Sequence, residues 1–290
     1  MSTLHLLIQL GLVYDIYWSK ERVMIKGIDH LIFWVDESSR LDKVSTAFFQ
    51  AGFTITERLD AGREDAPNRQ KLICFKDDSY IEILTVKDPN ARLKHRLHKI
   101  GQHGDGWADF CLDVENVEAE MSRVSAANIP VEGPTTHSKF LENGSQWGVK
   151  LFNTGIGIGH PVLPFMLEDT VGRHLRIPQS DLDHANGVVG IGGVRIAVND
   201  LDMAVDHMSR LLNLDANLTT DRDSTCFGKR FKLLSGQWID LFSPAPGFSQ
   251  LRSMLEKRGE GIFSAVLLGH ENVPISLQQN AIYGHLEIVK

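Results

Sequence analysis

Histidines at helical spacing are the first residues of this sequence that could do chemistry. His95 and His98 lie three positions apart in the segment 91–100, and His103 follows on a glycine-containing stretch. Residues three apart share one face of a helix, so these two imidazoles could bind a metal ion together. The neighbouring side chains favour a solvated basic helix instead, because four of them are cationic: Arg92, Lys94, Arg96 and Lys99.

The glycine run Gly155-Ile156-Gly157-Ile158-Gly159 superficially resembles a phosphate-binding loop. It lacks the Lys-Ser or Lys-Thr ending of such a loop and does not open a helix, so a hairpin connection between two strands is favoured. His160, which directly follows the run, is an additional candidate, as a fourth metal donor. No Gly-x-Ser-x-Gly sequence occurs, and the cysteines have no neighbouring base, so covalent catalysis has no support.

The composition is that of an ordinary folded protein. Of the 290 residues, 42% are hydrophobic and 23% are charged, and this length predicts about two domains. The formal net charge of -7 argues against nucleic acid as a partner. Cys74, Cys111 and Cys226 lie far apart in apolar segments, which predicts buried free thiols and a cytoplasmic location. The apolar stretch 4–17 contains Asp15 and is shorter than the roughly 20 residues of a membrane helix, so no membrane association is predicted.

Hydrophobic patterns define the elements that must position any site. In the first unit, a helix is predicted at 41–51, with Gly52 as its end. The strands predicted in this unit are 28–35, 53–58, 70–75 and 80–86. The order is therefore βαβββ. A connecting helix over 91–100, begun by Asp88-Pro89-Asn90 and ended by Gly101, leads to the next unit.

The same order recurs twice. The second unit has a helix at 117–127 and strands at 107–114, 130–131, 146–152 and 162–167. The third has a helix at 202–212 and strands at 190–198, 225–234 and 238–242. The segment 27–35 aligns with 190–198, and 80–84 aligns with 238–242 when Glu82 is matched to Asp240. A fourth, irregular unit from Gly261 has predicted strands at 264–268 and 285–289, so the chain is an array of related modules.

The chain resembles the vicinal-oxygen-chelate superfamily, which includes glyoxalase I, fosfomycin resistance proteins and extradiol dioxygenases, and within it the glyoxalase-like branch. Four stretches within roughly 27–242 carry the resemblance: Ile28-Asp29-His30-Leu31, Tyr80-Ile81-Glu82-Ile83-Leu84, Leu163-Pro164-Phe165 and His184-Ala185-Asn186-Gly187. The resemblance implies an α+β fold in which repeated βαβββ modules pair into curved mixed β-sheets that form a cup, with flanking helices.

The predicted organisation has four parts. An N-terminal extension (1–26) precedes a glyoxalase-like domain of two modules (27–170). A linker (171–189), with a boundary near residue 186, leads to C-terminal modules (190–290), which comprise the third unit and the irregular fourth.

The resemblance also implies divalent-metal ligands on the first and last strands of each module. His30 and Glu82 match these positions in the first module. In the second module, Asp109 falls at the first-strand position to within one or two residues, and Phe165 falls near the last-strand position, where a carboxylate would be expected. In the third module Gly193 replaces the histidine, which argues against the ring cleavage of extradiol dioxygenases.

A divalent ion of Zn, Mn, Fe, Co or Ni is therefore the predicted cofactor, with His30, Glu82 and Asp109 as its ligands. Its chemistry would be polarisation of a substrate carbonyl or chelation of adjacent oxygens, with Glu82 as ligand or as catalytic base. The alternative is structural: a buried strand histidine, an inherited surface carboxylate and a solvated or capped aspartate. Three aromatic residues either line the substrate pocket or belong to the strand core: Trp107, Phe110 and Phe165.

Two functions follow from these residues. The first is a metal-dependent lyase or isomerase that acts on a small oxygenated molecule. The second is a metal-free protein that sequesters a small apolar or aromatic compound, which the incomplete ligand set favours. A further hypothesis makes the C-terminal modules a dimerisation half, which predicts a homodimer.

Overall fold

A computed structural model describes residues 25–57, 67–141, 143–220, 226–247, 250–270, 273–276 and 285–290. The predicted N-terminal extension (1–26) lies outside these residues, apart from its last two positions, which begin the first strand. Arg58 and Thr225, at the edges of two predicted strands, also lie outside them. Within the described residues, no helix is long and apolar enough to cross a membrane.

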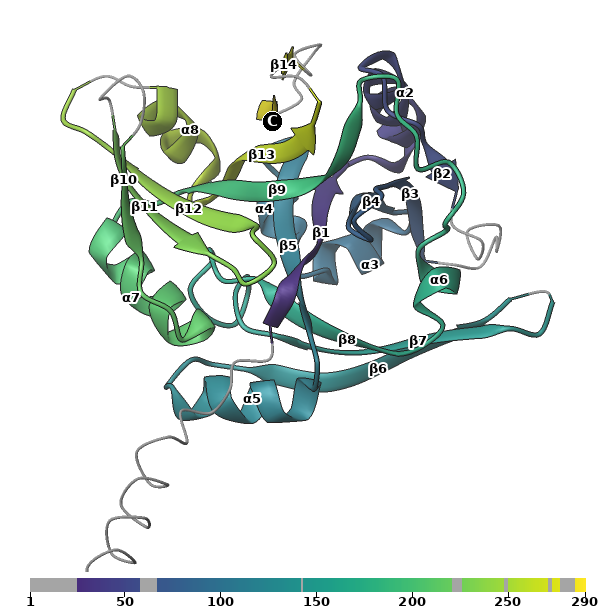
Figure 1. Cartoon of the computed structure of the whole chain (residues 1–290), viewed down its shortest axis with the longest axis horizontal. Helices are drawn as coiled ribbons and strands as arrows, with labels where there is room; N and C mark the ends of the chain where they lie inside the picture. Colours follow the sequence, from purple (N-terminus) through teal and green to yellow (C-terminus); the bar gives the residue numbers. More distant parts are fainter. Residues whose placement is uncertain are drawn as a thin grey trace, which may run out of the picture.

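The first two modules build one eight-stranded mixed sheet in the order β2-β3-β4-β1-β5-β8-β7-β6 (Figure 1). Its strands are β1 (Ile25–Trp34), β2 (Thr56–Glu57), β3 (Asn68–Cys74), β4 (Tyr80–Val86), β5 (Gly106–Val114), β6 (Glu132–Phe140), β7 (Gln146–Asn153) and β8 (Phe165–Val171). The first strands of the two modules, β1 and β5, are antiparallel neighbours at the centre of the sheet. Each pairs in parallel with the last strand of its own module, so the two modules are related by a pseudo-twofold axis between them.

The C-terminal half builds a second, seven-stranded sheet in the order β10-β11-β12-β9-β13-β15-β14. Its strands are β9 (Val188–Ala197), β10 (Asn217–Thr220), β11 (Cys226–Lys232), β12 (Trp238–Pro244), β13 (Gly261–Gly269), β14 (Val273–Ser276) and β15 (His285–Val289). His30 pairs with Tyr80 in the first sheet, and Gly193 pairs with Trp238 in the second. This register confirms the alignment of the first and third modules and the predicted α+β fold of cup-forming modules.

Helices connect and flank the strands. They are η1 (Ser38–Arg40), α2 (Leu41–Gln50), α3 (Pro89–Lys94), α4 (His98–Gly101), α5 (Val117–Ala126), α6 (Arg173–Arg176), α7 (Leu201–Leu212) and α8 (Gln250–Arg258). The Asp88 side chain accepts hydrogen bonds from the N–H groups of Asn90 and Ala91, and Pro89 takes the first helical position. The predicted start signal Asp88-Pro89-Asn90 is therefore confirmed, although α3 begins at Pro89 and not at Ala91. The prediction of one continuous helix over 91–100 is wrong, because His95 is extended and α4 begins only at His98.

Several strands differ from the sequence prediction, and for β6 the physical reason is clear. The strand predicted at 130–131 is wrong: no strand lies there, and the longer β6, whose residues are nearly all exposed, begins directly after it at Glu132. A strand without a buried face has no hydrophobic alternation, so its sequence Glu-Gly-Pro-Thr-Thr-His-Ser-Lys-Phe gives no period-two signal. Strand β10 was not predicted at all, and β2 contains only two residues of the predicted 53–58.

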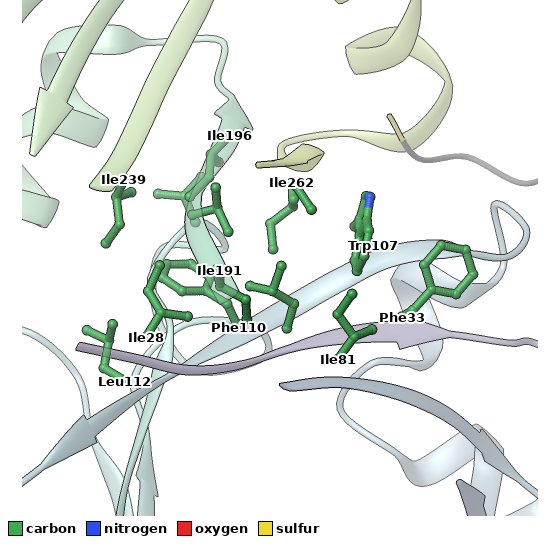
Figure 2. Packing of buried hydrophobic residues seen from close by; sticks show 14 of the residues in the cluster. Ile28, Phe33, Ile81, Trp107, Phe110, Leu112, Ile191, Ile196, Ile239 and Ile262 are labelled. Atoms are coloured by element: carbon green, nitrogen blue, oxygen red, sulfur yellow. The ribbon is translucent and has the colours of Figure 1, made fainter. Parts of the chain in front are cut away.

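A single hydrophobic core joins the two sheets. Figure 2 shows Ile28, Trp107 and Phe110 of the first sheet together with Ile191 and Ile262 of the second. The Trp107 indole N–H donates a hydrogen bond to the carbonyl of His285, 3.1 Å away. The central strands of the first sheet are therefore buried on both faces, since their other side lines the cup.

Two glycines allow each half of the chain to reach the first strand of the other. Asp77 accepts a 3.1 Å hydrogen bond from the N–H that follows Gly190, and Gln237 accepts a 2.7 Å hydrogen bond from the N–H that follows Gly27. A Cβ atom at Gly190 would lie 2.2 Å from Asp77 Oδ2, and one at Gly27 would lie 2.4 Å from Gln237 Oε1. These aligned glycines therefore serve packing between the halves.

Candidate active site

Two β-bulges turn adjacent residues of the central strands onto the cup face. In β1 the bulge lies between Ile28 and His30, so Asp29 is the inserted residue and both Asp29 and His30 face the cup. In β5 the inserted residue is Ala108, next to Asp109. The bulges explain how Asp29 and His30, although consecutive in a strand, can act on the same side of the sheet.

His30 is held in one orientation by its neighbours. Its side chain is 4% exposed, and its Nδ1 lies 2.6 Å from Asp29 Oδ1. The ring stacks on Tyr80, with centroids 4.5 Å apart, and meets the edge of Phe165 at 5.4 Å. Because an ionised carboxylate only accepts hydrogen bonds, Nδ1 carries the proton and Nε2 presents its lone pair to the cup, 3.9 Å from Glu82 Oε2.

Two arginines of α6 hold Asp29 ionised. Arg176 donates to both carboxylate oxygens of Asp29, at 3.2 and 3.0 Å, and Arg173 donates to Oδ2 at 2.8 Å. Burial opposes ionisation, but Arg176, His30 and Arg173 outweigh it and hold the pKa of Asp29 well below its ordinary value. Asp169 bridges the two guanidinium groups. The segment predicted only as a linker (171–189) thus supplies the residues that support His30.

The second module contributes Asp109 and Phe165 at the positions that the resemblance implies. His30 pairs with Cys111 and Ile32 pairs with Asp109, so the pseudo-twofold axis exchanges His30 with Asp109. Phe165 pairs with Cys111 as Glu82 pairs with Ile32, so Phe165 occupies the position of Glu82. The cup therefore joins an imidazole and a carboxylate from one module with a carboxylate and a phenyl ring from the other.

Arg96 is a further cup residue that the sequence did not indicate. Its guanidinium donates to Asp109 Oδ2 and lies 4.7 Å from the centroid of the Phe165 ring. Burial raises the pKa of Asp109 above its ordinary value, although Arg96 opposes this shift. The break between α3 and α4 brings Arg96 inward, and only the presence of four cations around two histidines marked this segment in the sequence.

His95 also enters the cup side of the sheet. Its ring stacks on Trp34 with centroids 5.0 Å apart, and burial, with a smaller contribution from Arg96, lowers its pKa to about 4. The interpretation of 91–100 as a solvated basic helix is therefore wrong for His95 and Arg96. His98 instead contacts Gln102, four residues further along the chain, and because His95 is extended the two histidines do not share the face of one continuous helix.

The predicted pocket aromatics separate into two groups. Phe165 packs with Ile32 and Trp34 in the apolar part of the cup. Trp107 and Phe110 instead belong to the core between the sheets, on the other face of β5 (Figure 2). The structure thus brings together His30, Glu82, Asp109 and Phe165, and places Trp107 and Phe110 elsewhere.

The donor chemistry of the cup fits a divalent metal at His30 and Glu82. His30 Nε2 and Glu82 Oε2 face each other, and the Asp29 hydrogen bond at Nδ1 is the usual outer support of a ligating histidine. Asp29, His30 and Cys111 also lie within 4.8 Å of one another. That group is a poor metal site, because Asp29 is engaged by His30 and two arginines and burial raises the pKa of the Cys111 thiol well above its ordinary value.

The second sheet carries no imidazole at the equivalent position. A Cβ atom on Gly193 would lie 2.4 Å from the Trp238 carbonyl oxygen and 2.8 Å from its indole ring, so Trp238 fills the space of the His30 side chain. Asp240, which aligns with Glu82, is fully buried and accepts two 2.7 Å hydrogen bonds from Arg230. The polar residues of this cup therefore bind each other.

Paired βαβββ modules around a cup, with the polar residues on their first and last strands, define a protein of the vicinal-oxygen-chelate superfamily. Within it, the chain belongs to the family of the glyoxalase-like domain, whose sequence model matches residues 28–212. No curated protein matches the sequence.

Solved structures of low sequence identity share the fold. A hypothetical protein from Staphylococcus aureus is similar at 13% identity and a TM-score of 0.63, with 90% of this chain and 99% of that chain covered. A mutant of 4-hydroxymandelate synthase from Streptomyces coelicolor is similar at 12% identity and a TM-score of 0.58, with 84% and 71% covered. A fusion protein of a xylose isomerase-like TIM barrel and 4-hydroxyphenylpyruvate dioxygenase reaches 14% and 0.56, with 86% and 38% covered.

Proposed function

We propose that the cup of the first sheet is the active site of a divalent-metal-dependent lyase or isomerase that acts on a small oxygenated molecule. The observation that carries the proposal is the geometry of His30. Its Nδ1 is hydrogen-bonded to Asp29, which accepts hydrogen bonds from two arginines. The Nε2 atom of His30 points to Glu82. A histidine that served only to fill the strand would not need a buried, ionised partner, because the burial of a charge is costly.

His30 and Glu82 would hold the ion, and Asp109 would join them if Arg96 released its carboxylate. When bound, a Zn, Mn, Fe, Co or Ni ion supplies Lewis-acid polarisation of a substrate oxygen. The protein's own contribution is positional and electrostatic. Asp29 keeps the Nε2 lone pair of His30 directed at the cup. If Glu82 is not a ligand, its carboxylate can instead accept a proton from a substrate carbon that lies next to a carbonyl.

The apolar part of the cup restricts the substrate. Ile32, Trp34, Leu84 and Phe165 form one buried cluster beside the polar residues. Such walls exclude water and favour a compact substrate with an apolar or aromatic part and one oxygenated end, which is a common pattern in small-molecule sites.

A metal-free binding protein is the second candidate, and Arg96 favours it. The Arg96 guanidinium already contacts Asp109, so a side-chain cation instead of a metal ion neutralises this carboxylate. Phe165 supplies no donor at the last-strand position. In this case the cup binds its ligand by apolar contact and by hydrogen bonds to His30 and Arg96.

Elemental analysis of the untagged full-length protein separates the two functions. The wild type is compared with His30→Ala and Glu82→Gln, and with His137→Ala as a control, because His137 is exposed in β6. Loss of about one equivalent of metal in both cup variants and none in the control supports the metalloenzyme. Equal metal content in all four proteins overturns it.

A ligand-binding measurement then tests the second candidate directly. Fluorescence titration with small aromatic carbonyl compounds, with and without EDTA, reports whether the cup needs a metal. Binding that is insensitive to EDTA but is weakened by His30→Ala supports the sequestering protein. Binding that is abolished by EDTA supports the metal-dependent enzyme.

A further inference from the structure

The glycine run 155–159 forms a tight loop between β7 and β8. A Cβ atom on Gly155 would lie 1.8 Å from the carbonyl oxygen of Leu163, and one on Gly159 would lie 2.4 Å from that of Thr154. The Thr154 hydroxyl donates a 2.5 Å hydrogen bond to the carbonyl of Pro164, which closes the base of the loop. The loop thus carries the next residue, His160, toward the second half of the molecule.

His160 is buried there without a hydrogen bond. Its side chain is only 7% exposed, and neither ring nitrogen has a partner within the described structure. Nε2 lies 3.8 Å from Glu260 Oε2, and the ring centroid lies 4.9 Å from that of His207 on α7. A buried polar group without a partner costs free energy, so these two unsatisfied nitrogens call for an explanation.

The two neighbours of His160 each have one atom left that could bind a metal ion. His207 Nδ1 lies 2.8 Å from the carbonyl of Met203; a carbonyl only accepts, so Nδ1 carries the proton and Nε2 keeps its lone pair. Glu260 Oε1 accepts a 2.7 Å hydrogen bond from the N–H of Asn199, which leaves Oε2 as the oxygen nearest His160. Backbone groups that fix the outer atoms of two donors are characteristic of metal sites.

We propose that His160, His207 and Glu260 form a second binding site, for a zinc-type divalent transition-metal ion, at the junction between the two sheets. Two imidazoles and one carboxylate suit such ions, whose ligands lie at about 2.0–2.2 Å. Around a tetrahedral ion, donor atoms are therefore about 3.4 Å apart. The 3.8 Å between His160 Nε2 and Glu260 Oε2 closes by a few tenths of an ångström, whereas the His207 side chain, whose ring centroid lies 4.9 Å from that of His160, has to move toward both to complete the set.

The electrostatic surroundings favour a cation. Besides Glu260, the Asp200 carboxylate acts on His160. His160 belongs to the first half of the chain, and His207 and Glu260 belong to the second, so a bound ion would tie the halves together.

Zinc binding to a cup-deficient protein tests this site independently of the proposed enzyme. The full chain carrying His30→Ala and Glu82→Gln is titrated with Zn²⁺ in competition with a chromophoric chelator. The same titration is repeated after addition of His160→Ala, His207→Gln or, as the control, His137→Ala. Since outer-sphere partners alone change metal affinity by 10- to 100-fold, loss of a direct ligand is expected to weaken binding on the order of 100-fold or more.

The expected result is one Zn²⁺ equivalent in the cup-deficient protein and in the His137 control, and a large loss of affinity in both junction variants. Co²⁺ substitution should give the visible absorption of a four-coordinate ion. If His160→Ala disturbs folding, as judged by circular dichroism, His207→Gln on the half-exposed helix face still decides the question. Absence of a Zn²⁺ equivalent in the cup-deficient protein, or equal affinity in His207→Gln and the His137 control, overturns the site.

Discussion

The buried arginine behind His30 offers the most direct test of how the site is held. Arg176 makes five hydrogen bonds: two to Asp29, two to Asp169 and one to the Tyr80 hydroxyl. Arg176→Met keeps much of the side-chain volume and removes all five. Asp29 then remains fully buried with only the partly exposed Arg173 and His30 as partners.

The expected loss of stability at pH 7 is about 3 kcal/mol. Removal of one partner from a buried ion pair costs about 3–5 kcal/mol, and the remaining arginine favours the lower end of that range. For domains of this size, 1 kcal/mol corresponds to roughly 2–4 °C, so the melting temperature should fall by roughly 6–12 °C. Differential scanning fluorimetry and urea unfolding both measure this. The control, Arg69→Met, removes an exposed contact with Asp42 and should cost less than about 1 kcal/mol.

The stability that Asp29 contributes depends on pH in a definite direction. The folded-state pKa of Asp29 lies well below its ordinary value, so the unfolded chain binds its proton first as the pH falls. The stability that Asp29 contributes is therefore present above about pH 4 and is lost as the pH falls through the folded-state pKa. The difference between wild type and Arg176→Met should shrink over that range. A loss no greater than that of Arg69→Met, or a difference that does not change with pH, would refute the reasoning.

Three further substitutions test other parts of the structure. The pKa of His95 is about 4 in the folded protein against 6.5 when unfolded, so protonation of the unfolded chain should lower the stability by up to about 3 kcal/mol as the pH falls from 6.5 to 4. In His95→Phe, urea unfolding should show that this pH dependence of the unfolding free energy is lost. Gly190→Ala should cost about 1–3 kcal/mol through its clash with Asp77, and the cost should be smaller in an Asp77→Ala background when a double-mutant cycle is measured. Gly193→His should destabilise the protein strongly and add no metal equivalent, because Trp238 presents its backbone oxygen to the new Cβ; elemental analysis and thermal unfolding check both outcomes.

The module order and the alignment of the halves could be predicted from sequence because they depend on local patterns. Buried strands such as β4 are rich in β-branched and aromatic residues, and the predicted bounds 80–86 match β4. The match of Glu82 to Asp240 needed only a shared acidic position between apolar neighbours, and the pairing register confirms it. Strand β6 lacks such a pattern, because no core covers either of its faces.

The sequence indicated the positions of His30, Glu82 and Asp109 in the candidate site. It did not indicate the residues that hold these side chains in place. Asp29 faces the cup because of a bulge, and regular strand alternation would direct it away from His30. Arg176 reaches Asp29 across 147 residues of sequence, from a segment whose composition indicates a linker. Arg96 turns inward at a helix break that the helical pattern conceals. In each case a long-range contact decides the orientation, and local propensity carries no information about such contacts.

The two cups share one arrangement of modules but differ in the residues around the aligned positions. In the first, Tyr80 stacks beside His30, and the cations that neutralise Asp29 come from α6, behind the imidazole, so that Nε2 and Glu82 still face each other. In the second, the residue that pairs with Gly193 is Trp238, and Arg230 lies within the cup itself, where it binds Asp240 through two hydrogen bonds. A carboxylate satisfied by a bidentate arginine has little capacity left for a metal ion. For the aligned carboxylates Glu82 and Asp240, the neutralising cation lies behind the histidine in the first cup and on the carboxylate in the second, which favours the first cup as the metal site of the proposed function.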